Sequence, residues 1–306
     1  MPRLIDDLRA PGARLEMPRF VPPYRQRDWQ HLAAKVHEII KTDLPVLLID
    51  NVAEYFFTCD QEYWSLEKDF PNLAPPYPAF WAEHKMVKKI HSKERGDTDV
   101  GSLVPKGRIG SLITAVDRDN VQGEDIPEGT RWILWCELYV DYHARGVTAQ
   151  GPHGSVFLAV DPEGKPLDRP RMNSFAPESL NEIMKSYITW FNPIFLAVSF
   201  LHCKNVTLID NHVPASLAKK QARASGIAPC RYKTLVIEPL KAILRGEGQS
   251  GEVGLPKALH ICRGHFRDYR EGRGLFGKYH QLVWQPSIVR GTKGQSAPPR
   301  EIEVKI

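Results

Sequence analysis

The sequence predicts an α+β fold, with antiparallel sheet regions that flank a central helical segment and a small antiparallel sheet near the C-terminus. Three observations lead to this prediction. Strand-like runs follow one another between residues 110 and 160 with short breaks, which is typical of an antiparallel meander rather than of alternating βαβ units. A long apolar helical stretch comes next, at about 174–202. Strand patterns then return after residue 231.

The first elements are short and varied. Residues 1–27 are rich in proline and arginine, and we expect an irregular arm. A helix is predicted over 28–43, with Asp28 as its cap. Its apolar residues recur on one face, at Leu32, Val36, Ile39 and Ile40. PVLLIDN (45–51) then has the composition of a short buried strand, and a helical or turn region follows it.

The meander is predicted from three runs, and an extended segment precedes it. PPYPAFWAEHK (75–85) is an extended segment bounded by prolines. GSLITAVDR (110–118), RWILWCELYVDYHA (131–144) and GSVFLAVDP (154–162) have strand character, and DPEGK supplies a turn after the last one. We expect these strands to pair with their neighbours in the chain.

The second half is predicted to begin with a helix capped by Ser174 and bent at Pro193. PASLAKKQARASG (214–226) forms the next helix, stopped by its glycine. Three strand-like runs follow, namely RYKTLVIEP, KALHICRGHF and QLVWQPSIV. We place a boundary near Pro170. It gives an α+β region over 1–170 with no assigned role, and a helical segment with a basic β-rich domain over 171–306.

The charge is unevenly distributed. The chain of 306 residues has a formal net charge of +5, but from Ser216 onward it holds 17 Lys and Arg against 7 Asp and Glu. The preceding part holds 24 against 29. A basic end on a neutral-to-acidic body favours a polyanionic partner for that end. The alternative is that the charges serve solubility and pairing between the two halves.

Several classes of protein are disfavoured. The five cysteines are widely separated and form no CxxC pair, so we expect free thiols in a reducing cytosol. The most apolar run, 188–201, is too short to span a bilayer, and the N-terminus lacks an apolar signal core. We therefore expect a cytoplasmic protein with no membrane partner. No Walker loop, dinucleotide glycine pattern, kinase signature or GxSxG motif occurs, and we expect no cofactor.

Residues 258–284 concentrate imidazole, guanidinium and aromatic rings. His260 and His265 are the candidates for acid/base catalysis, and Arg263 and Arg290 are the candidates for holding a phosphate. The candidate substrate-binding residues are Arg267, Tyr269, Lys278 and Trp284.

In an unbroken strand, Arg263, His265 and Arg267 would share one face, opposite His260. A bulge at Gly264 would instead bring His260 onto the face of His265.

This set of side chains suits RNA cleavage without a metal. One histidine takes the proton of the ribose 2′-hydroxyl while another protonates the leaving oxygen, and both roles suit a group that titrates near neutral pH. Arginine stabilises the negative charge that develops on the phosphate. Aromatic rings such as Trp284 can stack on an unpaired base. The alternative is a basic surface that only holds an anion, with His260 in the core.

A zinc site is a weaker candidate. His260, Cys262 and His265 could hold zinc, although no standard ligand spacing is present.

Two acidic pairs, Glu137 with Asp141 and Asp117 with Asp119, are possible magnesium ligands, but such residues more often cap strands and turns. Cys203 beside His202 is a poor candidate nucleophile, because adjacent helical residues point in different directions. We predict no metal site.

The motifs HICRGHF, LFGK, VW and VRG resemble a C-terminal signature of uncharacterised proteins from phages and other mobile elements. FLHCKNV (200–206) and RYKTLVIEP (231–239) resemble further parts of the same family, so that the resemblance covers roughly 196–291. No reaction is known for that family, and it assigns no catalytic residue. The order of helices followed by a small sheet bearing His and Arg is also similar to the barnase–EndoU–colicin–RelE group of ribonucleases.

These resemblances imply a nucleic-acid-acting protein of mobile-element origin. The narrower expectation is a metal-independent, toxin-like ribonuclease with RNA as the favoured partner. The alternative is a non-enzymatic phage accessory factor that binds nucleic acid or a host or phage protein. A structural or assembly component is a third possibility.

Overall fold

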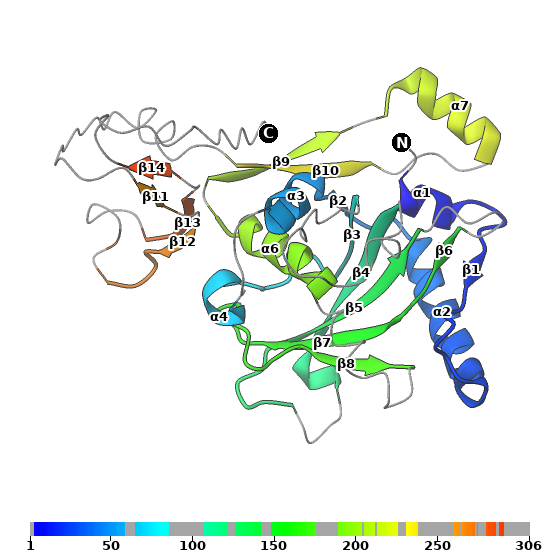
Figure 1. Ribbon diagram of the computed structural model, residues 1–306, viewed down its shortest axis with the longest axis horizontal. Coiled ribbons are helices and arrows are strands. Elements are labelled where there is room, and N and C mark those ends of the chain that lie inside the picture. Colours follow the sequence, from blue (N-terminus) through cyan, green and yellow to red (C-terminus); the bar gives the residue numbers. More distant parts are fainter. Residues whose placement is uncertain are drawn as a thin grey trace, which may run out of the picture.

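The chain forms an α+β fold with one large mixed sheet and two small antiparallel sheets, which confirms the predicted class (Figure 1). The computed structural model describes residues 3–58, 65–85, 107–121, 126–141, 148–175, 189–203, 205–211, 213–225, 231–237, 260–262, 265–272, 274, 280–285 and 288–290.

The predicted meander is confirmed. Its strands pair antiparallel in chain order, β7 lying beside β5. They are β3 (Ala79–Lys85), β4 (Arg108–Asp117), β5 (Trp132–Val140), β7 (Gly154–Val160) and β8 (Arg171–Ser174). The three predicted runs correspond to β4, β5 and β7, and the structure adds β3 and β8 at the two ends of the meander. This part of the topology could be predicted because each strand pairs with a neighbour in the chain, and antiparallel neighbours need no crossover helix between them.

The rest of the ten-stranded sheet is built from distant segments. β2 (Val46–Leu48) pairs parallel with both β3 and β10 (Tyr232–Ile237), and β9 (Val206–Asn211) pairs antiparallel with β10. At the other end, β1 (Leu15–Glu16) pairs parallel with β6 (Ala149–Gln150), which pairs with β5. The sheet is continuous across residue 170. The division at that point stays a prediction.

Helices pack against both faces of the sheet (Figure 1). α1 (Leu4–Arg9) and α2 (Gln26–Ile40) cover one face, where Trp81, Leu112 and Tyr139 are buried. α3 (Asp50–Thr58) and α6 (Asn192–Leu201) cover the other face and contribute to the largest apolar cluster. Shorter elements are α4 (Leu66–Asp69), η1 (Pro23–Arg25), η3 (Arg118–Asn120) and η5 (Thr189–Phe191), while α7 (Ala215–Ser225) lies beyond the sheet edge.

Two local expectations were wrong, and a third falls partly outside the described residues. The N-terminal arm is not irregular throughout, because residues 4–9 form α1. Leu4, Ile5 and Leu8 make up an apolar stripe on this helix, and all three are buried. Part of the central helix expected over about 174–202 lies outside the described residues. Its described part, α6, starts at Asn192, and Pro193 lies in the first turn of α6, where proline's missing N–H leaves no bond unmade. Asp28 does not cap α2 and lies within its first turn.

Near the C-terminus the chain forms two short hairpin-like pairs. β11 (His260–Cys262) pairs antiparallel with β14 (Ile288–Arg290), and β12 (His265–Asp268) pairs antiparallel with β13 (Leu282–Gln285). The single strand expected over KALHICRGHF is therefore divided between two sheets. Residues 263 and 264, on which the choice between an unbroken strand and a bulge at Gly264 depends, lie outside the described residues.

Across the described residues, no helix is both long enough and apolar enough to cross a membrane.

Candidate nucleic-acid interface

The β12–β13 pair is fixed to the body of the protein by an aromatic cluster and one asparagine. The Asn205 amide donates to the carbonyl of Trp284 at 2.9 Å, and its oxygen accepts from the Trp284 backbone N–H at 3.0 Å. The Trp284 ring packs edge-on against Phe200 and Phe266, with centroids 4.9 and 4.7 Å away. Buried backbone groups matched in this way hold the strand at a fixed position.

The two faces of β12 differ in environment because side chains alternate along a strand. Phe266 points into the aromatic cluster. Asp268 accepts from Arg270, whose Nη1 donates to the carbonyl of Glu163 in the turn after β7 at 3.5 Å. The residues that alternate with these two, and so lie on the opposite face, are His265, Arg267 and Tyr269. We call these three residues the β12 row.

Arg267 is the centre of the β12 row. Its Nε donates to His265 Nε2 at 3.2 Å and its Nη1 donates to the Tyr269 hydroxyl at 3.1 Å. His265 and Arg267 are exposed, and Tyr269 is half-buried. A guanidinium has five N–H groups, so most of this one remains available to a ligand. The row therefore presents an oriented cation between an imidazole and a phenol.

These bonds bear on the predicted catalytic role of His265. Nε2 accepts a hydrogen bond here, and in that tautomer the proton sits on Nδ1. To take a proton from a substrate through Nε2, the ring must first release Arg267. In this arrangement His265 orients the guanidinium, and a catalytic role requires a rearrangement on binding.

The other predicted site residues are placed as follows. The backbone register puts His260 directly opposite Arg290, in the sheet of β11 and β14. Arg263 and Lys278 lie outside the described residues. The structure thus brings the side chains of His265, Arg267 and Tyr269 together, and it pairs the backbones of His260 and Arg290.

Trp284 does not offer an exposed ring on which a base could stack. Its side chain is buried, at 5% exposure, between Phe200, Phe266 and Tyr55. Its indole is part of the core because β13 turns it inward toward α6. The expectation that it lines a ligand site is therefore corrected, and Tyr269 is the aromatic side chain that lies beside Arg267.

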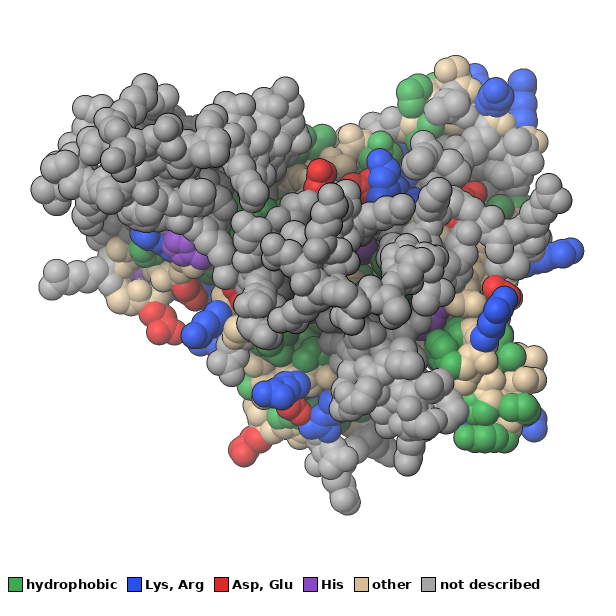
Figure 2. Space-filling view, viewed as in Figure 1, with side chains coloured by type: hydrophobic (Ala, Val, Ile, Leu, Met, Phe, Trp, Pro, Cys, Tyr) green, Lys and Arg blue, Asp and Glu red, His purple; other side chains and the backbone are tan. Residues whose placement is uncertain are grey.

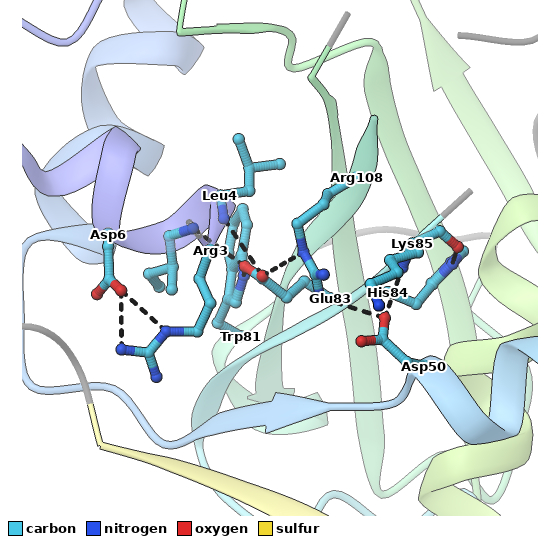
Figure 3. A network of polar contacts seen from close by, with 10 residues as sticks. Arg3, Leu4, Asp6, Asp50, Trp81, Glu83, His84, Lys85 and Arg108 are labelled. Atoms are coloured by element: carbon cyan, nitrogen blue, oxygen red, sulfur yellow. Dashed lines mark hydrogen bonds and ion pairs between the residues drawn. The ribbon is translucent and has the colours of Figure 1, made fainter. Parts of the chain in front are cut away.

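A buried polar network on β3 and β4 was missed by sequence reasoning (Figure 3). Glu83 is fully buried and accepts from Trp81 Nε1 at 2.9 Å and Arg108 Nε at 2.6 Å. It also accepts from the backbone N–H groups of Leu4 and Ile5, at 3.2 and 3.0 Å. Burial raises the pKa of Glu83, while the Arg108 charge and the hydrogen bonds oppose that rise.

The network continues to α3. Asp50 accepts from the Lys85 backbone N–H at 2.6 Å and from Arg108 Nη2 at 3.2 Å. His84 Nδ1 lies 2.8 Å from the Lys85 carbonyl, and burial lowers the pKa of His84 to about 4. These contacts join α1 and α3 to adjacent strands. The network is structural, because its bonds tie the chain to itself.

Glu137 is a second buried carboxyl group. It is 4% exposed, it accepts from Ser155 Oγ at 3.3 Å, and burial raises its pKa to about 7. Two residues to either side on β5, Trp135 Nε1 and the Tyr139 hydroxyl have no hydrogen-bond partner among the described residues.

The acidic pairs considered as magnesium ligands have other partners. Asp117 accepts from the Asp119 backbone N–H at 3.1 Å and pairs with Arg131 at 2.8 Å, so it caps the turn after β4. Within the described part of the chain, no three His, Cys, Asp or Glu side chains gather as a metal site would require. Burial raises the pKa of Cys203 to about 12, which disfavours the thiolate that a nucleophile needs.

No known protein family and no curated protein matches the chain. A crystal structure of AcrVA2 aligns with 80% of this chain and 71% of its own, at 14% sequence identity and a TM-score of 0.31. A likeness at that level carries no argument about fold or function. The resemblance to phage and mobile-element proteins stays a prediction.

Proposed function

We propose that this protein binds nucleic acid, with RNA favoured, through the β12 row. The observation that carries the proposal is the exposed Arg267 guanidinium held between His265 and Tyr269. An arginine fixed by two neighbours loses less side-chain freedom when it binds, and its planar fork matches phosphate oxygens. The aromatic cluster beneath the strand supplies the rigid support for this contact.

The excess of basic residues after Ser216 supports the same class of ligand, because a cationic surface attracts a phosphate backbone. Tyr269, half-buried beside the guanidinium, adds a ring and a hydroxyl that suit a ribose or an unstacked base. The resemblance over residues 196–291 supports a mobile-element origin.

Ribonuclease activity is the narrower proposal within this one. His265 is the acid/base candidate, and the reaction needs a second such group, for which His260 is the sequence-based candidate. In this proposal, substrate phosphate takes Arg267 away from His265 Nε2, and the freed nitrogen then handles the proton of the 2′-hydroxyl.

The test is binding and cleavage of labelled single-stranded RNA, in EDTA and in magnesium, over a range of salt concentrations. Arg267→Gln should weaken binding and reduce the slope of log K against log salt by roughly 0.7, the value for one phosphate contact with a single strand. Arg171→Gln is the matched control, since it removes an exposed arginine from β8, and its slope should equal that of the wild type.

His265→Gln separates the two versions of the proposal. Loss of cleavage in EDTA with binding retained supports the ribonuclease. Binding without cleavage by the wild type leaves an RNA-binding protein and removes the enzyme. Unchanged slopes for Arg267→Gln show that the β12 row is not the phosphate contact, and a wild type that binds only a host or phage protein supports the accessory factor.

A further inference from the structure

α7 carries a basic stripe that lies far from the β12 row. Ser216, Lys219, Lys220 and Arg223 follow the helical spacing i, i+3, i+4 and i+7, so they share one face. Together they line a surface hollow of about 450 Å³. In Figure 1 this helix lies past β9 and β10, on the opposite side of the molecule from β12, and Figure 2 shows basic side chains at its place. We call these four residues the α7 stripe.

The positive charge of the α7 stripe is not balanced locally. All four side chains are exposed, and residues 213–225 contain no Asp or Glu. Lys219 and Lys220 each face Arg223 at a spacing where like charges destabilise a helix by roughly 0.2–0.5 kcal/mol per pair. Among the described residues, none forms an ion pair with any of these three cations. An anion bound there would relieve this repulsion.

The chemistry of the α7 stripe fits phosphodiester groups better than a protein surface. Lysine, arginine and serine all donate hydrogen bonds to phosphate oxygens. Lysine is depleted at the centres of protein–protein interfaces, which favour aromatic and apolar anchors. No large apolar side chain is exposed among those described on α7. The stripe is about 10 Å long at 1.5 Å per residue, which allows contact with more than one phosphate of a strand.

We propose that the α7 stripe is a second nucleic-acid contact, which binds the phosphate backbone without reading sequence. It rests on the proposed function only for the class of ligand, since its residues are separate from the β12 row. Two separated basic surfaces on one protein hold a longer strand than either surface alone. Release then requires both contacts to open, and the affinity exceeds that of each contact by itself.

The test uses the triple variant Lys219→Gln, Lys220→Gln, Arg223→Gln in the full chain. Glutamine has nearly the helix propensity of lysine and arginine, so α7 should persist. The matched control is Arg27→Gln, Lys35→Gln, Lys41→Gln, which removes three exposed cations on or next to α2 and causes the same change in net charge. Binding of labelled single-stranded RNA is titrated across salt concentration, beside Arg267→Gln and with a phosphatidylserine vesicle assay.

The triple variant should reduce the salt slope by about 2, at roughly 0.7 for each of three lost phosphate contacts, and equally for unrelated sequences. The control should keep the wild-type slope. A triple variant with the wild-type slope overturns this inference, and if Arg267→Gln lowers the slope at the same time, the proposed function still stands.

A lowered slope for the triple variant together with a wild-type slope for Arg267→Gln supports the α7 stripe, and it shows that the β12 row is not a phosphate contact. Equal losses in the triple variant and its control show that only net charge matters, which overturns the inference. A triple variant that loses vesicle binding and keeps its RNA slope assigns the stripe to anionic lipid and also overturns it. A wild type that does not bind RNA overturns both proposals.

Discussion

The buried network around Glu83 and the exposed β12 row contain similar side chains but differ in the partners of their central arginine. Both centre on an arginine with two or more polar neighbours. In the buried network, Arg108 faces two carboxylates and the donors of α1 complete the shell around Glu83. In the β12 row, Arg267 donates to an imidazole nitrogen and a phenol oxygen, and no carboxylate among the described residues pairs with it. A buried charge needs an opposite charge or hydrogen-bond partners within the protein, whereas an exposed charge is solvated by water and remains available to a ligand.

The largest effect is expected from breaking the buried network. Glu83→Gln leaves Arg108 without its closest carboxylate and turns an amide N–H toward donors, so the free energy of unfolding should fall by about 3–5 kcal/mol. Denaturant unfolding of the purified variant measures this loss. A loss below about 1 kcal/mol would show that the network resembles a surface ion pair.

Buried histidines should make the protein sensitive to acid. Burial lowers the pKa values of His84 and His153 to about 4, below their ordinary value of 6.5. A histidine that is harder to protonate when folded contributes stability that is present above pH 6.5 and lost as pH falls toward 4. The loss is about 3 kcal/mol for each residue. Unfolding free energies measured between pH 7 and 4 test this, and His153→Gln should flatten the curve.

Glu137 should act in the opposite direction. Its folded pKa of about 7 lies above the ordinary 4.5, so the folded state binds the proton more tightly, and stability falls as pH rises from 4.5 to 7. Glu137→Gln removes that penalty. The variant should gain up to about 3 kcal/mol at pH 8 and lose stability more steeply than the wild type on acidification. A variant less stable than the wild type at pH 8 contradicts this.

The anchor of the β12 row should have a smaller effect. Asn205→Ala leaves the buried N–H and carbonyl of Trp284 without partners, at a cost of about 1–3 kcal/mol. Denaturant unfolding gives the cost, and hydrogen exchange at the Trp284 amide should speed up. Exchange that stays slow would mean that the aromatic packing alone holds β13.

The smallest effect is expected at the surface. The Arg171–Asp168 pair is exposed, and its hydrogen bonds lower the pKa of Asp168. Asp168→Asn should change the free energy of unfolding by no more than about 1 kcal/mol, and less in high salt. A larger change would weaken the contrast between buried and exposed charges, and the same denaturant titration in low and high salt decides it.

The comparison also separates local from distant information in the chain. Alternation within one strand was enough to place His265 and Arg267 on the same face of β12. Apolar periodicity was enough to find α2, the proline and glycine at the ends of a segment were enough to find α7, and strand-like composition was enough to find β4, β5 and β7. These features depend on residues a few positions apart, whose relative directions are fixed by backbone geometry.

The tertiary structure alone decided the features that depend on distant partners. α1 forms where the carboxylate of Glu83, almost 80 residues away, receives its first N–H groups. Trp284 became a core residue because Asn205 and Phe200 meet it from another segment. The parallel pairing of β2 with β10 likewise joins remote parts of the chain. Local sequence carries the direction of a side chain, but burial and partner depend on which remote segment packs against it, and short-range patterns do not encode that choice.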